Sequence, residues 1–206
     1  MIVLDIETSG LDFHKCGIIQ IGALELENPA NQFLQEGRID DDEGVVQSTN
    51  LPNAKTVEEV TGKTEQQMRD KTLQSQMQLL ENFFEWCKGV KVRNFICQNT
   101  QFDYSFVLTK ANKFGLSVPF YHRAFDLPTI AQIRYLDLKG KFSIKGSYTG
   151  MGLREILEFV GMKDERDIHS AIEDARITAE CFSRLVYGKN LLEEFKEFPI
   201  PDYLRK

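Results

Sequence analysis

The sequence lacks the segments that membrane, secreted and zinc-finger proteins require. No apolar run reaches transmembrane length, and no basic and apolar leader precedes the first apolar segment, so we expect a cytoplasmic protein with no membrane partner. The four cysteines lie far apart, without the short paired spacings of zinc sites or a disulfide framework, which predicts reduced thiols. Low-complexity segments and internal repeats are also missing, as in an ordinary globular protein.

An excess of positive charge is also lacking. The formal net charge is −6 at pH 7 and the isoelectric point is about 5.2. This balance argues against a protein that coats nucleic acid electrostatically. It remains compatible with an enzyme that gathers acidic residues at a metal site and binds only a few phosphates. From a length of 206 residues we expect one domain at residues 1–187, followed by a C-terminal appendage at residues 188–206 that is not a separate domain.

The apolar pattern predicts an α/β fold. Three strands joined by short links, one of them a turn at residues 28–31, favour an antiparallel meander. A later strand that runs into a helix adds an α/β unit, so we expect a mixed sheet. Residues 40–71 are expected to form loops and short helical turns. The expected strands are residues 2–10, 18–27, 32–39 and 90–97, and the expected helices are residues 73–88, 102–115, 127–136, 153–160 and 171–187.

Two carboxylates interrupt the first apolar run. Asp5 and Glu7 are two positions apart, so in a strand they project from the same face. Like charges held this close are unfavourable unless a cation lies between them, and Mg²⁺ favours oxygen ligands of this kind. The alternative is a strand that ends in a solvated acidic turn.

Two further carboxylates and a histidine extend this pattern. Asp103 opens a helix directly after a strand and can reach the same sheet edge as Asp5. Asp174 follows His169 by five positions, which is about 140° on a regular helix, so both reach one site only if His169 precedes the regular helix. Taken singly, Asp103 also fits a helix cap, Asp174 a solvated helix residue and His169 a surface or capping histidine.

Four carboxylates and one histidine meet the needs of two-metal phosphodiester hydrolysis. In that chemistry two divalent cations, Mg²⁺ or Mn²⁺, lie roughly 3.5–4 Å apart and clamp the attacking and leaving oxygens. Asp5 at the strand end is the candidate bridging ligand. His169 is the candidate base, because the unperturbed pKa of histidine, about 6.5, lies near working pH.

Three motifs resemble those of the DEDDh 3′-to-5′ exonucleases, a family that includes bacterial proofreading subunits and ribonuclease T. The resemblance implies a ribonuclease H-like fold with a mixed five-stranded sheet, a three-strand antiparallel meander plus parallel strands, flanked by helices. It also implies that Asp5, Glu7, Asp103 and Asp174 are metal ligands and that His169 is the general base. The motifs are Asp5-Ile6-Glu7-Thr8-Ser9-Gly10-Leu11, Asn99-Thr100-Gln101-Phe102-Asp103 and His169-Ser170-Ala171-Ile172-Glu173-Asp174-Ala175.

Two positions depart from the usual form of this family. Gln98 precedes Asn99 where many members have histidine, and Ser170 stands where arginine is frequent. Neither change removes a metal ligand, and both concern how the substrate is bound. The sister branch has a tyrosine at the position of Ser170, so the resemblance favours the histidine branch.

The resemblance further implies substrate contacts. Thr8 and Leu11 are expected at the 3′-terminal nucleotide, with Phe102 near it, and Asn99 of the second motif is a further candidate. An apolar contact with the last base is sequence-tolerant, whereas core packing is the alternative for Leu11 and Phe102.

Residues 139–150 form the one markedly basic stretch, with three lysines and no acid. Lys141 and Lys145 are therefore candidates for neutralising backbone phosphates upstream of the cut. A solvated flexible loop is the alternative for this stretch.

These observations predict a 3′-to-5′ exonuclease that releases nucleoside monophosphates from single-stranded DNA or RNA. The alternative among enzymes is an RNA-specific 3′ trimming enzyme or an oligoribonucleotide hydrolase. The alternative of another class is a non-catalytic nucleic-acid-binding module on the same fold. The expected partners are single-stranded 3′ ends, and a DNA polymerase is a further candidate.

Overall fold

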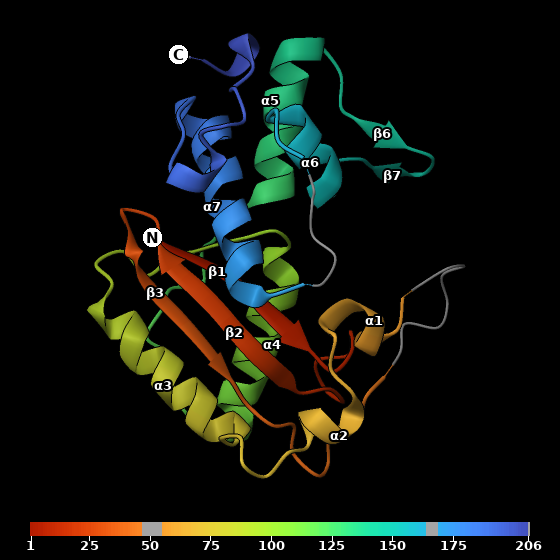
Figure 1. Ribbon diagram of the computed structural model, residues 1–206, viewed down its shortest axis with the longest axis vertical. Helices are drawn as coiled ribbons and strands as arrows, with labels where there is room; N and C mark the ends of the chain where they lie inside the picture. The colour runs from red at the N-terminus through yellow and green to blue at the C-terminus, as the bar shows by residue number, and fades with distance from the viewer. Residues whose placement is uncertain (47–54, 164–168, 206) are drawn as a thin grey trace.

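A mixed sheet positions the rest of the chain. The computed structural model describes residues 1–46, 55–163 and 169–205. The strands β1 (Ile2–Thr8), β2 (Ile18–Glu25) and β3 (Asn28–Glu36) form an antiparallel meander, and β4 (Phe95–Cys97) and β5 (Phe125–Asp126) extend the sheet in parallel with β1. The strand order is β3-β2-β1-β4-β5 (Figure 1). The predicted α/β class with a mixed five-stranded sheet is thereby confirmed.

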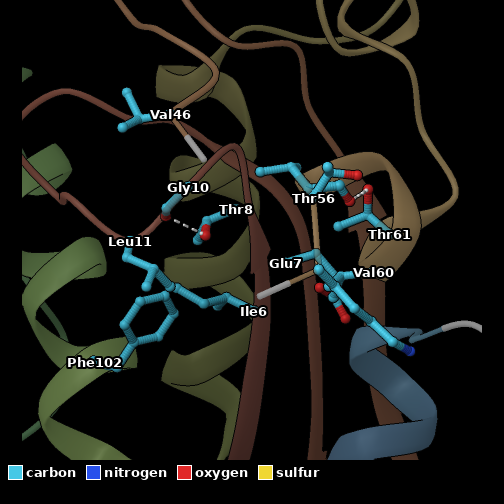
Figure 2. A pocket seen from close by; sticks show the side chains of 12 residues that line it. Ile6, Glu7, Thr8, Gly10, Leu11, Val46, Thr56, Val60, Thr61 and Phe102 are labelled. Atoms are coloured by element: carbon cyan, nitrogen blue, oxygen red, sulfur yellow. Dashed lines mark hydrogen bonds between the residues drawn. The ribbon is translucent and has the colours of Figure 1, made fainter. Parts of the chain in front are cut away.

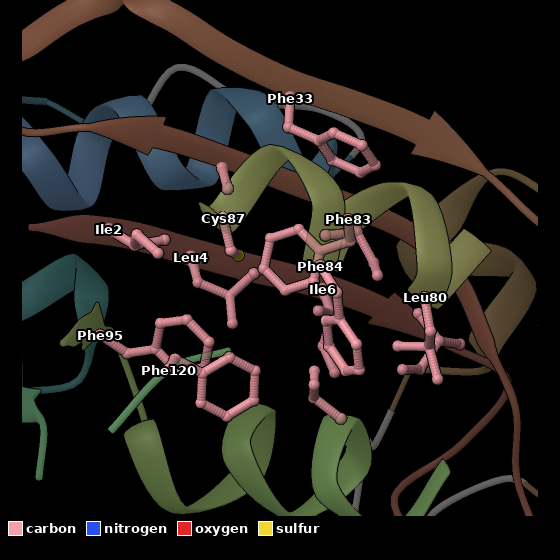
Figure 3. Packing of buried hydrophobic residues seen from close by; sticks show 14 of the residues in the cluster. Ile2, Leu4, Ile6, Phe33, Leu80, Phe83, Phe84, Cys87, Phe95 and Phe120 are labelled. Atoms are coloured by element: carbon pink, nitrogen blue, oxygen red, sulfur yellow. The ribbon is translucent and has the colours of Figure 1, made fainter. Parts of the chain in front are cut away.

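Helices cover both faces of this sheet because β1 is apolar on both. Ile2, Leu4 and Ile6 pack with the aromatic residues of α3 (Gln76–Gly89) and with α4 (Thr100–Lys113) (Figure 3). Val3, on the opposite face, belongs to the core that includes residues of α5 (Leu127–Lys139), α6 (Leu153–Phe159) and α7 (Ala171–Tyr187). Side chains alternate along a strand, so Asp5 and Glu7 share the face of Val3, which α7 covers.

The meander differs from prediction at its second connection. The predicted turn at residues 28–31 is wrong, because the chain already reverses at Leu26 and Glu27 and β3 begins at Asn28. Pro29 is tolerated in β3 because this strand lies at the edge of the sheet, where a missing backbone N–H breaks no ladder bond. The N–H of Leu26 is satisfied by the carbonyl of Met1, at 2.8 Å.

Two short helices lie in the segment that was expected to form loops and short helical turns. In α1 (Val57–Thr61), Thr56 and Glu59 form a capping box, and in α2 (Glu65–Met68), Thr64 and Gln67 form another. The helix α1 ends at Gly62, whose φ of 68° suits glycine. These helices bring residues 55–61 close to the end of β1 (Figure 1).

The basic stretch forms a small hairpin rather than an open loop. Strands β6 (Ile144–Lys145) and β7 (Tyr148–Thr149) pair with each other and project from the part of the molecule where α5 and α6 lie (Figure 1). The buried side chain of Gln132 holds the base of the hairpin, with its amide nitrogen 2.9 Å from the Ser143 carbonyl and 2.7 Å from the Gly150 carbonyl.

The last described residues pack onto α7. Two 3₁₀ turns, Glu193–Phe195 and Asp202–Leu204, follow that helix, and Leu204 is buried in the α5–α7 core. The division into a domain at residues 1–187 and an appendage stays a prediction. All four cysteines are buried, and none forms a disulfide bond in the part of the chain that the structure describes. Across the described ranges, we find no helix with the length and apolar character needed to cross a membrane.

Candidate active site

The end of β1 presents the first group of carboxylates. The parallel neighbour β4 pairs with β1 only at Ile2 and Val3, so β1 continues past it with Asp5 and Glu7. At this edge the backbone of Ile6 hydrogen-bonds to Asp103. Asp103 comes from the first turn of α4, which packs on the face of the sheet opposite to α7. A strand end and a helix start, about 100 residues apart in sequence, thus meet at one edge.

The start of α7 closes the site from the opposite face. The helix begins at Ala171, so His169 lies before the regular helix, as the angular argument from the sequence requires. Nδ1 of His169 is 2.9 Å from Oδ2 of Asp174. Ligand atoms of Glu7, His169 and Asp174 all lie within 4.8 Å of one another. The structure therefore brings residues of the first and third motifs together.

The side chain of His169 is more exposed to water than the buried acids around it. Glu7, Asp103 and Asp174 are 9%, 4% and 5% exposed, whereas the side chain of His169 is 38% exposed and Asp5 is half-buried. Glu7, Asp103 and Asp174 are thus shielded from water, while the histidine remains accessible to it.

The electrostatics of this group favour a cation. The pKa of Asp103 is raised to about 8, chiefly by burial and also by the negative charges of Glu7 and Asp126, against the hydrogen bonds from backbone groups, including that of Ile6. Buried carboxylate oxygens with one imidazole nitrogen nearby form a donor set that suits a hard divalent cation. Burial and the charges of Asp103 and Asp5 also raise the pKa of the Cys97 thiol well above its usual range, so Cys97 stays protonated.

A cavity of about 210 Å³ adjoins Glu7. Leu11 and Phe102 lie on one side of it and residues of α1 on the other, with Ile6 and Glu7 between them (Figure 2). The hydroxyl of Thr8 donates to the carbonyl of Gly10 at 2.7 Å, which fixes the turn after β1. The residues that line the cavity are Ile6, Glu7, Thr8, Gly10, Leu11, Val46, Lys55, Thr56, Val57, Val60, Thr61 and Phe102.

The predicted substrate residues fall into two groups. Thr8, Leu11 and Phe102 line the cavity, and Leu11 is 59% exposed, so core packing does not account for it. Asn99, Lys141 and Lys145 are not among the described residues that line it. Lys141 precedes the β6–β7 hairpin and Lys145 lies on β6, with its Nζ 2.9 Å from Oε1 of Glu155.

Sequence reasoning missed two features of the site. The α1 wall of the cavity was not expected, although the Thr-x-x-Glu pattern at Thr56 and Glu59 is a helix-start signature that would have placed a helix there. The second feature is Asp126, whose Oδ2 accepts from the backbone N–H of Thr129 at 3.1 Å and thereby caps α5. Its Oδ1 also accepts from the backbone N–H of Thr100 at 3.2 Å, so one carboxylate serves the first turns of both α4 and α5 beside Asp103.

Comparisons with known proteins identify relatives of this chain. A family model described as exonuclease matches residues 2–182. A DNA polymerase III of the PolC type from Caldanaerobacter subterraneus subsp. tengcongensis is 30% identical over 185 residues, which is 90% of this chain and 11% of that relative. The chain thus spans about a tenth of the length of this curated relative.

Solved exonuclease structures share the fold. The nuclease domain of 3′hExo, a DEDDh family member bound to rAMP, is 19% identical with a TM-score of 0.61, over 98% of this chain and 95% of that one. Exonuclease I of E. coli in complex with a dT13 oligonucleotide is 14% identical with a TM-score of 0.61, over 89% of this chain and 40% of that one. The ribonuclease H-like assignment of the fold is thereby confirmed.

Proposed function

Because the chain belongs to the exonuclease family whose model it matches over residues 2–182, we propose that it removes nucleoside monophosphates from the 3′ ends of single-stranded DNA or RNA. The observation that carries this proposal is the convergence of Glu7, His169 and Asp174 within 4.8 Å beside a cavity. A water-accessible base next to buried acids, with room for one terminal nucleoside, is what hydrolysis of the last phosphodiester requires.

Asp5, Glu7, Asp103 and Asp174 are the residues proposed to hold two divalent cations, Mg²⁺ or Mn²⁺. When bound, such ions stabilise the charge that develops on the phosphate and lower the pKa of water. The support for this assignment is the donor chemistry, since all four groups are carboxylates and Asp103 lies buried near other acids. The chain itself supplies the negative charge that attracts and retains the ions.

His169 is the proposed general base. With a proton on Nδ1, that nitrogen donates to Asp174, and Nε2 carries the lone pair that accepts a proton from water. The oxygen of that water then bonds to phosphorus, and the bond from phosphorus to the 3′ oxygen of the penultimate nucleotide breaks. The released 3′ oxygen takes up a proton, which leaves a shortened strand and a nucleoside 5′-monophosphate.

The cavity is the proposed site of the 3′-terminal nucleoside. Apolar contact with Leu11 and Phe102 would be worth about 1–3 kcal/mol for a stacked base and tolerates any sequence. Thr8 lies at the same end of β1, and Asn99 begins the helix that carries Asp103. Lys141 and Lys145 are proposed to contact phosphates further upstream, as point charges that do not read sequence.

The comparisons support both nucleic acids as candidate substrates. The relative named as a DNA polymerase favours DNA, and makes a polymerase a proposed partner, whereas the neighbour bound to rAMP favours an RNA trimming activity. Neither carries over on its own, because the first is far longer than this chain and the second shares only the fold.

The deciding experiment is digestion of 5′-labelled single-stranded DNA and RNA of equal sequence, with Mg²⁺, with Mn²⁺ and with chelator. We expect a metal-dependent ladder that shortens from the 3′ end, and the ratio of the two rates identifies the preferred substrate. Metal-dependent binding without cleavage of either strand would instead favour the non-catalytic binding module.

Two substitutions test the assigned roles in the same assay. His169→Ala should leave metal binding nearly intact and lower kcat by roughly 10²- to 10⁴-fold, the range for loss of a general base. The control is His122→Ala, an exposed histidine near the opposite end of β4, which should retain full turnover. Asp5→Ala should abolish cleavage and weaken metal binding. Normal turnover in His169→Ala, or unchanged metal affinity in Asp5→Ala, would refute the respective role.

A further inference from the structure

The first turn of α7 takes its cap from a neighbouring strand. In the described part of the chain, Ser170 at the N-cap position makes no side-chain cap hydrogen bond. Instead the backbone N–H of Ala171 donates to Oε1 of Gln20 on β2, at 2.8 Å. Since the first N–H groups of a helix have no partner within the helix, this side chain satisfies one of them across more than 150 positions of sequence.

The orientation of the Gln20 amide is fixed by its other end. Its Nε2 donates to Oε1 of Glu36 on β3 at 3.0 Å, and Oε2 of Glu36 accepts from Nζ of Lys63 at 2.9 Å. A carboxylate accepts but does not donate, so it selects the NH₂ group of the amide and turns the amide oxygen toward Ala171. Lys63 directly follows Gly62, at the end of the helix that walls the cavity.

A second link joins the same two segments. The backbone N–H of His169 donates to the carbonyl of Val60 in α1 at 3.1 Å. His169 and the start of α7 are therefore connected to α1 twice, once by a direct bond and once through Gln20, Glu36 and Lys63. The wall of the cavity and the proposed base belong to one hydrogen-bonded unit.

Strand register ties this unit to the carboxylates. In the β1–β2 ladder, Glu7 is opposite Gln20 and Asp5 is opposite Gly22. At Gly22 a Cβ atom would lie 2.2 Å from the backbone of Ala171 and Ile172, so only glycine lets α7 approach the sheet this closely. The two residues of β2 that receive α7 thus stand beside the two acidic residues of β1.

We propose that Gln20 is a positioning residue for the exonuclease site, which rests on the function proposed above. By holding the start of α7 beside Glu7, it sets where His169 and Asp174 stand relative to the β1 carboxylates. Glu36 and Lys63 extend this link to α1, so the terminal nucleoside and the base are placed by the same set of bonds.

The test compares three variants by kcat and KM on a 5′-labelled oligonucleotide. Gln20→Met keeps the volume but loses both hydrogen bonds, and should lower kcat about 10-fold with KM changed less than about 3-fold, since catalysis is sensitive to placement. Gln20→Glu keeps an oxygen for Ala171 at a helix start that favours negative charge, but it loses the donor to Glu36 and places two carboxylates together beside Lys63, so it should recover part of kcat. The matched control is Gln35→Met on β3, whose Oε1 accepts from Gln74 and Asn82 instead.

Amide hydrogen exchange supplies a readout that does not depend on activity. Gln20→Met should raise the exchange rate of Ala171 about 10-fold or more, and Gln20→Glu should raise it less, because its carboxylate still accepts that N–H. Lys63→Met acts at the far end of the link and should produce a smaller change in the same direction, which keeps the proposal testable if Gln20→Met does not fold.

The outcomes separate the two proposals. If the wild-type chain cleaves the oligonucleotide and the variants Gln20→Met and Lys63→Met have the same kcat as wild type, the role of Gln20 is overturned while the exonuclease function stands. Equal losses in Gln20→Met and Gln20→Glu would also overturn it, because an acceptor for Ala171 would then make no difference. A wild-type chain that cleaves nothing, with Ala171 exchange responding as expected, would overturn the exonuclease function while the hydrogen-bonded link stands.

Discussion

Two buried carboxylates, Asp103 and Glu180, lie in very different surroundings. Glu180, in the middle of α7, accepts from Nε of Arg184 at 2.7 Å and from the backbone N–H groups of Leu191 and Leu192 at 2.8 and 2.9 Å. Asp103 lies in the first turn of α4, where burial and the charges of Glu7 and Asp126 raise its pKa to about 8. One acid has a cation built into the fold, whereas the other is surrounded by charge of its own sign.

This difference separates a structural charge from a functional one. A buried ion pair with satisfied hydrogen bonds offsets the cost of removing its charges from water, and Glu180 with Arg184 fastens the last described residues to α7. Acids that raise one another's pKa reduce stability in the metal-free protein, and such groups cluster at functional sites. The arrangement at Asp103 therefore supports the proposal that a cation binds there from outside.

The largest effect on stability is expected when the built-in cation is removed. Arg184→Ala leaves the buried Glu180 carboxylate without its cation and removes the hydrogen bonds to the carbonyls of Val160, Phe195 and Phe198. It should therefore lower the free energy of unfolding by about 3–5 kcal/mol. Urea unfolding monitored by circular dichroism measures this change.

Arg154→Ala is the matched control for Arg184→Ala. Arg154 also pairs with a glutamate four positions away, Glu158, but both side chains are exposed, so the unfolding midpoint should stay within experimental error. If Arg184→Ala were equally mild, the buried Glu180–Arg184 pair would not hold the last described residues against α7. Glu180 would then not be a structural charge that can be compared with Asp103.

At Asp103, removal of the carboxylate is expected to stabilise the metal-free protein rather than destabilise it. In Asp103 the folded-state pKa, about 8, lies above the ordinary value of 3.8. The stability that comes from its proton is complete below the ordinary value and is lost as pH rises toward 8. The Tm of metal-free protein should therefore fall between about pH 5 and pH 8, and Asp103→Asn should raise Tm at pH 8 by about 2–4 °C per kcal/mol recovered.

Differential scanning calorimetry in chelator, repeated with Mg²⁺, checks this expectation. Added Mg²⁺ should stabilise the wild-type chain at pH 8 more than it stabilises Asp103→Asn. Asp202→Asn, at an exposed acid in the C-terminal 3₁₀ turn, is the control and should follow the wild-type curve. A metal-free Tm that does not depend on Asp103 would mean that the clustered acids cost the fold nothing.

The sequence was sufficient to predict the elements of the fold that depend on local residue patterns. Runs of apolar residues predicted β1 and β2, the helical spacing of apolar residues predicted α3, and the matched family model confirms the DEDDh exonuclease resemblance. The failure at residues 28–31 came from treating Pro29 as a turn residue, when an edge strand accepts proline as well. Turn chemistry and edge-strand chemistry overlap, so composition alone does not separate them.

Features that depend on distant contacts were not predictable. Gln20 reads as an ordinary polar residue in a half-buried strand, and only the packing of α7 on β2 gives it a helix N–H to accept. Val60 likewise reaches His169 through a backbone bond that leaves no mark on side-chain identity. The proposed ligands could be named from the sequence because chemistry restricts such groups to acids and histidine, whereas the residues that position them can be of almost any type.

The smallest effects are expected at the exposed charges of the β6–β7 hairpin, where pairing matters little to the fold. Lys141→Ala and Lys145→Ala should each leave kcat unchanged and reduce the dependence of oligonucleotide affinity on log salt by about 0.7, the value for one phosphate contact on a single strand. Fluorescence anisotropy with a 5′-labelled oligonucleotide in chelator measures this slope. Lys88→Ala is the matched control, because Lys88 pairs with Glu85 on α3 as Lys145 pairs with Glu155. If both hairpin variants behave like Lys88→Ala, the strand does not follow the hairpin. Lys55, at the cavity itself, then becomes the lysine to test for the upstream phosphate.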